Sequence, residues 1–483
     1  MDTLVRVADG LGRWTARWVP SSFAIAVLLT MFTWCLALVW AATPLPVVIA
    51  GWAGGFWELL SFSMEMALVM FTGYLLALTR PVRFLLEKIA SFAKTPRKAV
   101  VTMALASMGL AYINWGLSIV ASAMLVRFVV KRQRDVDYRL LVACAYFGLG
   151  ATWHAGLSAS APLLVAKPKH FLSEQLGQIP ISETIFSRFN LLLLLATMAV
   201  LTFMAFAMHP KPERTVRVPP DVVPQLGVFE APVAPKKERT FATFMDHSRL
   251  LNVILGGAGL IYFVCAIAFR GMEGYQQQFL INSVQASNWS GVFKGALLDG
   301  GPGLLHGWAF LDIDTVNFLF LSLAILLHRT PAALLKASEE AATVLSGIVL
   351  QFPLYAGIYG VFKTSGLTDR IGHAFVSIST QRTFPAIVYL YSGIVNYFVP
   401  SGGAKWAIEA PYLINAAKSL NVPPAKVVLA YAWGDMATDL IQPFWALPLL
   451  SVAKLEFKDI LGFLLLAFMV YVPLVTLAFF IAG

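Results

Sequence analysis

The sequence Ile113-Asn114-Trp115-Gly116 interrupts a long apolar stretch, and Val395-Asn396-Tyr397-Phe398-Val399-Pro400-Ser401-Gly402-Gly403 interrupts a second one in a similar way. Each interruption is followed by another apolar segment that is itself broken, 145–162 in the first case and 430–448 in the second. Within these segments Ala151-Thr152 matches Ala437-Thr438. The chain therefore looks duplicated. Interrupted apolar segments at corresponding places in two halves are typical of the central binding site of a membrane carrier.

The composition is that of a polytopic membrane protein. Of the 483 residues, 58% are hydrophobic and only 13% are charged, and the mean hydropathy is +0.72. Lipid leaves no water for the backbone, so the spans must be helices or a closed barrel. Continuous apolar runs such as 191–208 lack the alternation of a barrel strand. We therefore expect an all-α fold with about nine full spans of the lipid bilayer.

The positive charges set the expected orientation. The net charge is +10, and lysines and arginines gather in the loops between apolar runs, at 80–98, 131–139 and 211–249. Basic loops of this kind stay on the cytoplasmic side of a membrane. This rule explains the charge without nucleic acid, which we do not expect as a partner. It also places the N-terminus of this multi-pass protein in the cytoplasm.

Two segments are expected to enter the membrane and to leave it on the same side. Segment 99–130 has basic residues at both ends and a break at Asn114. At about 1.5 Å per residue, neither of its arms can cross a hydrocarbon core of about 30 Å. We therefore predict a re-entrant hairpin from the cytoplasmic side. Segment 384–417, broken between Asn396 and Gly403, is predicted to form a second hairpin from the outside, so that the two halves form an inverted repeat.

These assignments divide the chain into three parts. Residues 1–208 form the first repeat half, 209–249 a cytoplasmic linker and 250–483 the second repeat half. The linker prediction rests on seven prolines and mixed charge among residues 209–240, a composition typical of flexible connectors. Residues 271–312 are polar and glycine-rich, and we predict an extracellular insert there, to which the sequence assigns no role.

The helix breaks supply the expected binding chemistry. A helix interrupted in mid-membrane exposes carbonyl groups, which suit Na⁺, on its incoming arm and N–H groups, which suit a carboxylate, on its outgoing arm. Ionisable residues inside apolar spans are functional candidates by default. The predicted substrate-binding residues are Asn114, Trp115, Gly116, Asn396, Ser401, Gly402 and Gly403. The predicted ion-coupling residues are Asn114, Asn396, Thr152, Thr438, Asp435 and Asp439.

Structural interpretations compete with several of these assignments. Asn114 and Asn396 could simply cap the helix arms, a role that asparagine performs widely. Lys405 and Glu409 are four residues apart, and we interpret them as an ion pair on one hairpin arm. His154 is interpreted as a packing residue rather than as a proton carrier. Aromatic residues near the breaks more often pack than bind, although an aromatic wall would suit a short alkyl chain.

The run from Asn396 to Pro411, together with Gln442-Pro443-Phe444-Trp445-Ala446-Leu447-Pro448, resembles the signature of the bacterial short-chain fatty acid transporter family, including its acetoacetate/butyrate uptake type. The second hairpin is more distantly similar to those of p-aminobenzoyl-glutamate transporters and divalent-anion/sodium symporters. The resemblance implies a homodimer in which a transport domain bearing both hairpins moves as an elevator along a scaffold domain, often coupled to Na⁺. Asp439 stands where the relatives lead us to expect asparagine, so Na⁺ and H⁺ are both open as the coupling ion.

The sequence also narrows the class of substrate. No arginine lies at the centre of either hairpin or either broken span, whereas a dicarboxylate ordinarily calls for more cations. A small monocarboxylate such as butyrate or acetoacetate fits better, carried in symport with Na⁺ or H⁺. Alternatives are a different organic anion (a dicarboxylate or an amino-acyl conjugate) and an anion channel. No catalytic motif or zinc-ligand spacing is present, so we predict neither an enzyme nor a cofactor, with Na⁺ only as a coupling ion.

Overall fold

The computed structural model describes residues 22–219, 232, 240–272, 274–295, 301–398 and 401–482. Every regular element within these ranges is a helix. Five helical stretches are long and apolar enough to cross a membrane: α4 (Leu60–Ala77), Tyr138–Val165, α11 (Arg188–Met208), α14 (Arg249–Gly271) and α26 (Phe457–Ala482). The expected all-helical, multi-pass membrane protein is confirmed, while the count of nine spans stays a prediction.

The five stretches differ in what surrounds them. Only 28% of the apolar window of α11 and of α14, and 33% of that of α26, is buried in protein, against 94% for Tyr138–Val165. Apolar helix surface that the protein leaves bare is surface that lipid covers. Helices α11, α14 and α26 therefore face lipid, whereas Tyr138–Val165 lies at the centre of the protein.

Further helices lie among these five stretches. They are α2 (Ser22–Val39), α3 (Leu45–Gly55), α18 (Ile313–His328), α19 (Pro331–Ala342) and α20 (Ser346–Ser365). Glycines allow α3 and α20 to pack closely, because a Cβ atom on Gly55 would lie 2.8 Å from the Cα atom of Gly360. Small residues at such contacts are the usual way in which membrane helices bring their backbones together.

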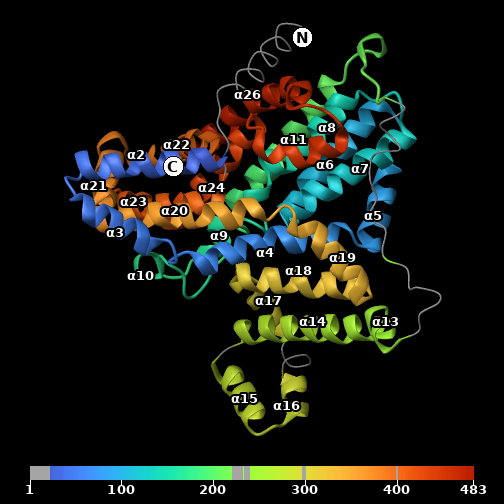
Figure 1. The fold of residues 1–483 in the computed structure, drawn as a ribbon, viewed down its shortest axis with the longest axis horizontal. Coiled ribbons are helices and arrows are strands. Elements are labelled where there is room, and N and C mark those ends of the chain that lie inside the picture. Colours follow the sequence, from blue (N-terminus) through green and yellow to red (C-terminus); the bar gives the residue numbers. More distant parts are fainter. Residues whose placement is uncertain are drawn as a thin grey trace.

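Two amphipathic helices lie at opposite ends of the longest axis of the molecule. Helix α5 (Arg80–Ala90) and helix α21 (Leu367–Ile378) each have one apolar and one polar face. In Figure 1 both run across the direction of the helices between them. An amphipathic helix in this orientation is typical of a membrane–water interface.

Two helical hairpins dominate the interior. The first consists of α6 (Pro96–Ile113) and α7 (Trp115–Arg132), separated only by Asn114, whose backbone is extended. The second consists of α22 (Phe384–Phe398) and α23 (Gly402–Ser419). Residues 399 and 400 at its tip lie outside the described residues. In Figure 1 the second hairpin occupies the left part of the molecule and the first hairpin the right part.

Each hairpin packs against a helix that is itself broken. Helix α6 packs against α8 (Tyr138–Ala151), which is followed by η1 (Trp153–Ala155) and α9 (Ser160–Val165). Helix α22 packs against α24 (Pro424–Ala437), which is followed by η5 (Thr438–Leu440), η6 (Phe444–Ala446) and α25 (Leu447–Ala453). The two breaks, at Thr152 and at Thr438, thus lie beside the two hairpins.

One helix contacts both hairpin tips. On α4 the backbone carbonyl of Val69 accepts a hydrogen bond from Asn114 Nδ2 at 3.1 Å. A Cβ atom on Gly403, at the other tip, would lie 2.7 Å from the ring of Phe62 and 3.0 Å from Met66 Sδ. Helix α4 therefore packs against both hairpin tips and supports them both.

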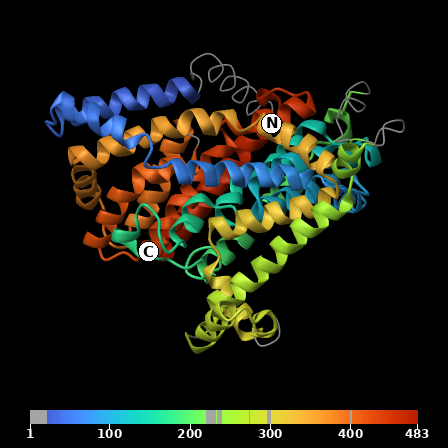
Figure 2. The same cartoon turned by 60° about the horizontal axis from the view of Figure 1, so that its bottom comes forward.

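The predicted insert and linker lie outside this interior. After α14, helices α15 (Gly274–Gln285) and α16 (Trp289–Phe293) project from the rest of the protein, away from both hairpins (Figures 1 and 2). Helix α17 (Gly301–Gly307) and η4 (Trp308–Phe310) then pack back against α14. Residues 209–219 of the linker cross the start of α8, where the Tyr138 N–H donates to the Val216 carbonyl at 2.8 Å. The linker residues 220–231 and 233–239, and the N-terminal residues 1–21, lie outside the described residues.

Replacing Gly73 with alanine is expected to destabilise the first hairpin. A Cβ atom on Gly73 of α4 would overlap Oδ1 of Asn114, and overpacking of this kind costs about 1–3 kcal/mol. The purified Gly73→Ala protein in detergent should therefore unfold at a lower temperature than the wild type. Gly109→Ala is the control, because a Cβ atom there meets no atom within 4 Å. Equal unfolding temperatures for Gly73→Ala and the wild type would contradict the prediction.

Candidate functional site

The hairpin tips and the helix breaks surround a cavity of about 40 Å³. Buried water requires about 10–15 Å³ of such space, so the cavity has room for about three water molecules or for a molecule of a few heavy atoms. The residues that line it are Met66, Trp115, Leu149, Trp153, Ser160, Ile348, Phe352, Asn396, Ser401, Gly402, Gly403, Asp435, Asp439 and Trp445. Both hairpins and both broken spans contribute to this wall, together with α4 and α20.

One side of the cavity is aromatic. The ring centroids of Trp115 and Trp445 lie 5.3 Å apart, and those of Trp115 and Trp153 lie 6.1 Å apart, in both cases with tilted planes. Edge-to-face contacts of this kind hold the three indoles in fixed relative positions. The wall they form is apolar and rigid, which suits a short hydrocarbon group.

The tip of the first hairpin has its backbone groups satisfied by the protein. Asn114 Oδ1 accepts from the Leu117 N–H at 2.8 Å, and Ser158 Oγ accepts from the Trp115 N–H at 2.9 Å. The side-chain NH₂ group of Asn114 donates to the Val69 carbonyl of α4, as described above. The first N–H groups of a helix are the ones that bind anions when they are left open. At α7 they are partly closed by these side chains, and Asn114 itself is fully buried.

The tip of the second hairpin is open. Helix α23 begins at Gly402, and the side chain of the preceding Ser401 makes no capping hydrogen bond. The N–H groups of the first helical turn have no acceptor within the helix, and together they carry a partial positive charge. Ser401, Gly402 and Gly403 all line the cavity. Because Gly402 has no side chain, Asp435 and His154 can pack closely against this turn, where a Cβ atom would lie 2.6 Å from Asp435 Oδ2.

A buried carboxylate lies opposite, held by neutral donors. Asn396 Nδ2 donates to Asp439 Oδ1 at 2.8 Å and contacts Thr438 Oγ1 at 3.2 Å. Trp153 Nε1 donates to Asp439 Oδ2 at 3.1 Å, so both oxygens are engaged. Among the described residues, no lysine, arginine or histidine nitrogen lies within 4.0 Å of this carboxylate. A carboxylate buried without a cation is unfavourable, and it favours the binding of one.

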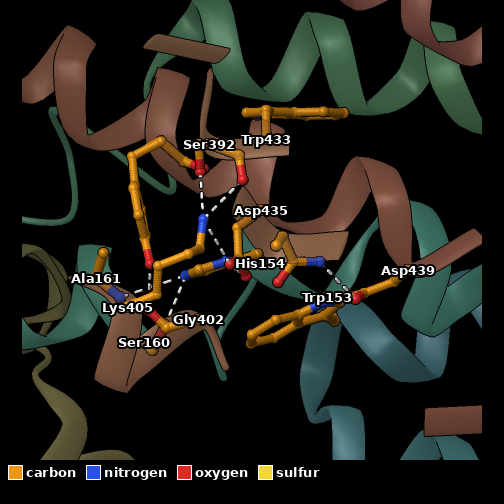
Figure 3. A network of polar contacts seen from close by, with 12 residues as sticks. Trp153, His154, Ser160, Ala161, Ser392, Gly402, Lys405, Trp433, Asp435 and Asp439 are labelled. Carbon is orange, nitrogen blue, oxygen red and sulfur yellow. Dashed lines mark hydrogen bonds and ion pairs between the residues drawn. The ribbon is translucent and has the colours of Figure 1, made fainter. Parts of the chain in front are cut away.

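The second aspartate has a fixed cation. Lys405 Nζ lies 3.1 Å from Asp435 Oδ1 and donates to the carbonyl and the hydroxyl of Ser392, at 2.9 and 2.6 Å. It also lies 4.4 Å from the centre of the Tyr431 ring, a cation–π contact. Figure 3 shows the ammonium group between Ser392 and Asp435. Lys405 and Asp435 are each 1% exposed, so this is a fully buried ion pair that connects the second hairpin with α24.

His154 completes this network from the first half of the chain. Its Nδ1 lies 2.9 Å from Asp435 Oδ2, and its Nε2 lies 2.8 Å from Ser160 Oγ and accepts from the Ala161 N–H at 3.4 Å. Because Nε2 accepts from a backbone N–H, the imidazole is neutral and donates its Nδ1 proton to Asp435. The ring also stacks on Trp153, with 4.2 Å between the centroids. This network thus connects the first and second halves of the chain (Figure 3).

The structure brings together most of the predicted residues. Those that line the cavity are Trp115, Asn396, Ser401, Gly402, Gly403, Asp435 and Asp439. Thr438 contacts Asn396 behind the cavity wall. Asn114, Gly116 and Thr152 do not line the cavity but hold the first hairpin in place: a Cβ atom on Gly116 would lie 2.8 Å from the Met70 carbonyl, and Thr152 Oγ1 donates to the Met108 carbonyl at 3.0 Å.

Sequence reasoning missed three residues of the site. Lys405 was interpreted as the partner of Glu409, but its nearest acidic partner is Asp435, and Glu409 Oε2 is 4.0 Å away. His154 was interpreted as packing, and Trp153 was not considered. The signal that could have found Lys405 and His154 is their position, because a charged or titratable residue inside an apolar span needs a partner there.

Comparison with known proteins gives a consistent family. The sequence profile described as "Short chain fatty acid transporter" matches residues 3–302 and 304–482. A protein of Escherichia coli (strain K12) that carries the provisional name of a short-chain fatty acid transporter is 35% identical over 466 residues, covering 96% of both chains. A protein of Haemophilus influenzae with the same provisional name is 34% identical over 479 residues, covering 97% of this chain and 98% of the relative.

Two solved structures share the fold. The Alcanivorax borkumensis YdaH transporter superposes with a TM-score of 0.52, at 16% identity, over 95% of this chain and 98% of that one. Neisseria gonorrhoeae MtrF, described as one of a class of antimetabolite efflux pumps, superposes with a TM-score of 0.53, at 15% identity, over 99% and 97% of the two chains. At this level of identity the likeness concerns the fold alone.

The buried ion pair gives a stability prediction. Lys405→Met leaves Asp435 without its cation, and Asp435→Asn leaves Lys405 without its anion, so each single change should destabilise the protein by about 3–5 kcal/mol. The double variant should recover much of this loss, because no uncompensated charge remains. Thermal unfolding of the purified proteins in detergent measures the effect. Lys363→Met is the control, since its exposed pair with Glu58 contributes at most about 1 kcal/mol. A double variant as unstable as the sum of the two single ones would contradict the coupling.

Proposed function

The chain belongs to the short-chain fatty acid transporter family, and from this premise we propose that it carries small monocarboxylates such as butyrate or acetoacetate by secondary active transport. It is a transporter and not an enzyme. In the proposed cycle one carboxylate moves together with Na⁺ or H⁺ across a bacterial cytoplasmic membrane. In this proposal the carboxylate and the coupling cation both bind in the cavity between the hairpin tips.

The open N-terminus of α23 carries the proposal for the substrate. Gly402 and Gly403 line the cavity at a helix start where Ser401 makes no capping hydrogen bond, and the N–H groups of such a start suit one carboxylate group. The indoles of Trp115, Trp153 and Trp445 line the same cavity and suit a short alkyl chain. No arginine lines the cavity, and a second carboxylate would find no bidentate partner among the lining residues. The chemistry favours a small monocarboxylate over a dicarboxylate or an amino-acyl conjugate.

Asp439 supports the proposal of cation coupling. Its carboxylate is 2% exposed and is held only by neutral donors, from Asn396 and Trp153. A cation bound beside it would neutralise this charge and so remove its repulsion of the substrate carboxylate. The substrate would then bind more tightly when the cation is present, and this coupling of the two binding steps is what symport requires.

We extend the proposal to the architecture of the cycle. The hairpins and broken spans act as a transport domain that slides along a scaffold made of α3, α4, α18 and α20, in a homodimer of nine-span protomers with cytoplasmic N-termini. One ion-pair cluster supports this division. Lys167, just after α9, lies 2.7 Å from Glu65 of α4 and 2.8 Å from Asp314 of α18, so it bridges the proposed moving and fixed parts. Such a bridge has to break when the two parts slide.

Uptake by proteoliposomes tests the function. Labelled butyrate should accumulate when an inward Na⁺ or H⁺ gradient is imposed, after subtraction of the passive diffusion of the uncharged acid into protein-free liposomes. Unlabelled acetoacetate should compete and succinate should not. Transport that saturates but responds to neither gradient would contradict coupling, and a current that does not saturate with butyrate would indicate a channel.

Asp439→Asn should uncouple the transporter. Without the carboxylate, the gradient-driven accumulation of butyrate should fall about tenfold or more, which corresponds to at least about 1.4 kcal/mol of cation-binding free energy. Asp369→Asn, at an exposed position on α21, is the control and should accumulate butyrate normally. Full gradient dependence in Asp439→Asn would remove Asp439 from the coupling site.

Gly402→Ala should weaken substrate binding. A Cβ atom at this position would lie 2.6 Å from Asp435 Oδ2 and 2.8 Å from His154 Cε1, so it would also fill the approach to the N–H groups of α23. We expect the KM for butyrate to rise about tenfold or more, equivalent to about 1.4 kcal/mol or more of binding energy. Gly372→Ala, on α21, meets its neighbours only at ordinary contact distances of 3.4 Å and above and should leave KM unchanged. An unchanged KM in Gly402→Ala would place the carboxylate elsewhere.

A further inference from the structure

Glu409 is a buried carboxyl group that the transport site described above does not use. It lies on α23 one turn beyond Lys405, and the residue is 1% exposed. Both of its oxygen atoms are buried, and neither has a hydrogen-bond partner among the described residues. Buried polar side chains nearly always have such a partner, so a carboxyl group with two bare oxygens requires an explanation.

The nearby lysine cannot supply the missing donor. A lysine ammonium group has three N–H donors. Lys405 Nζ donates to the carbonyl and to the hydroxyl of Ser392, and Asp435 Oδ1 lies 3.1 Å from it as an ion-pair partner. Glu409 Oε2 lies 4.0 Å from Lys405 Nζ, at the outer limit of an ion pair. In this arrangement the Lys405 ammonium group lies nearer to the Asp435 carboxylate than to Glu409.

The other surroundings of Glu409 offer no counter-charge. Five titratable side chains interact electrostatically with Glu409. They are Lys405 and Tyr412 on its own helix, Tyr391 on α22, and Tyr431 and Asp435 on α24. The tyrosines Tyr391 and Tyr412 hydrogen-bond to each other, at 2.8 Å, and Tyr431 donates to the Gly402 carbonyl at 2.5 Å. Helices α20 and α21 also pack against α23, and their titratable residues are Tyr355, Tyr359, Lys363, Asp369, Arg370 and His373. Among the described residues, none of these forms an ion pair or a hydrogen bond with Glu409, and the Lys363 ammonium group pairs with Glu58 instead.

From this geometry we infer that Glu409 is a proton-binding site of the transporter, separate from the cation pocket at Asp439. An ionised carboxylate with no donor and no free cation is strongly destabilised inside a membrane protein, whereas the protonated carboxyl group is neutral. In the conformation described here, Glu409 therefore carries a proton. The inference rests on the proposed transport function and assigns a further ligand, H⁺, to the same hairpin.

Lys405 provides a means of releasing that proton. Lys405 and Glu409 are four residues apart on one helix, so a small rotation of the lysine side chain brings them into contact. If Asp435 exchanges its contact with Lys405 for another, the ammonium group becomes available to stabilise ionised Glu409. The proton then leaves the Glu409 carboxyl group for water. Movement of α24 relative to α23 would in this way be linked to the binding and release of one proton.

Infrared difference spectroscopy tests the protonation directly. A protonated carboxylic acid has a carbonyl stretching band that a carboxylate lacks. Purified wild-type protein at neutral pH should show this band for a buried acid, and Glu409→Gln should lack it. Glu409→Asp keeps an acid in a shorter side chain and should shift the band. Glu174→Gln, at an exposed position on α10 (Ser173–Leu176), is the control and should leave the band unchanged. A spectrum that is the same in the wild type, Glu409→Gln and Glu409→Asp would overturn the assignment.

Transport in two modes tests the role in the cycle. Glutamine mimics the protonated side chain, so Glu409→Gln should still exchange internal for external butyrate but should lose net uptake about tenfold or more. Protein-free liposomes again serve to subtract passive diffusion of the acid. Net uptake equal to that of the wild type would overturn the inference. If the wild type itself neither exchanges nor accumulates butyrate, the proposed function has failed instead. If Glu409→Gln does not fold, the band shift in Glu409→Asp decides the protonation.

Discussion

A helix that ends inside a membrane has backbone groups that lipid cannot satisfy, and this protein contains two such ends at its centre. The structure treats them differently. At α7 the N–H groups of Trp115 and Leu117 are closed by Ser158 and Asn114. At α23 the side chain of Ser401 makes no capping hydrogen bond, and the glycines of the first turn line the cavity. The two hairpins therefore have similar backbones and different chemistry, and the polar groups available to a ligand lie beside the second one.

Helix α4 contacts both of these hairpin tips. Phe62 and Met66 contact the second tip, whereas Val69, Met70 and Gly73 contact the first, so one face of a single helix serves both hairpins. Because both tips lean on the same helix, their positions along it are coupled through packing. At the second tip the Phe62 ring and Met66 Sδ fill the space that a side chain on Gly403 would take, so α4 and α23 pack closely there.

The local part of the site followed from the sequence. Helix-breaking residues inside apolar stretches located both tips, and the rule that a buried ionisable group is functional singled out Asp435 and Asp439. The partners of these aspartates did not follow. His154 is 281 residues from Asp435 along the chain, and Trp153 is 286 residues from Asp439. Contacts between residues so far apart in the chain depend on tertiary packing, which no local pattern encodes.

The sequence by itself determined that the chain is an all-helical membrane protein of the short-chain fatty acid transporter family, because apolar run length, charge and motif are local properties. Only the tertiary structure decided which carboxylate pairs with the buried Lys405. The spacing of Lys405 and Glu409 predicts a pair along one helix, but Asp435 from α24 lies closer to the lysine. An ammonium group has three N–H donors. Packing brings Ser392 and Asp435 nearer to Lys405 than Glu409, whose two oxygens have no hydrogen-bond partner among the described residues.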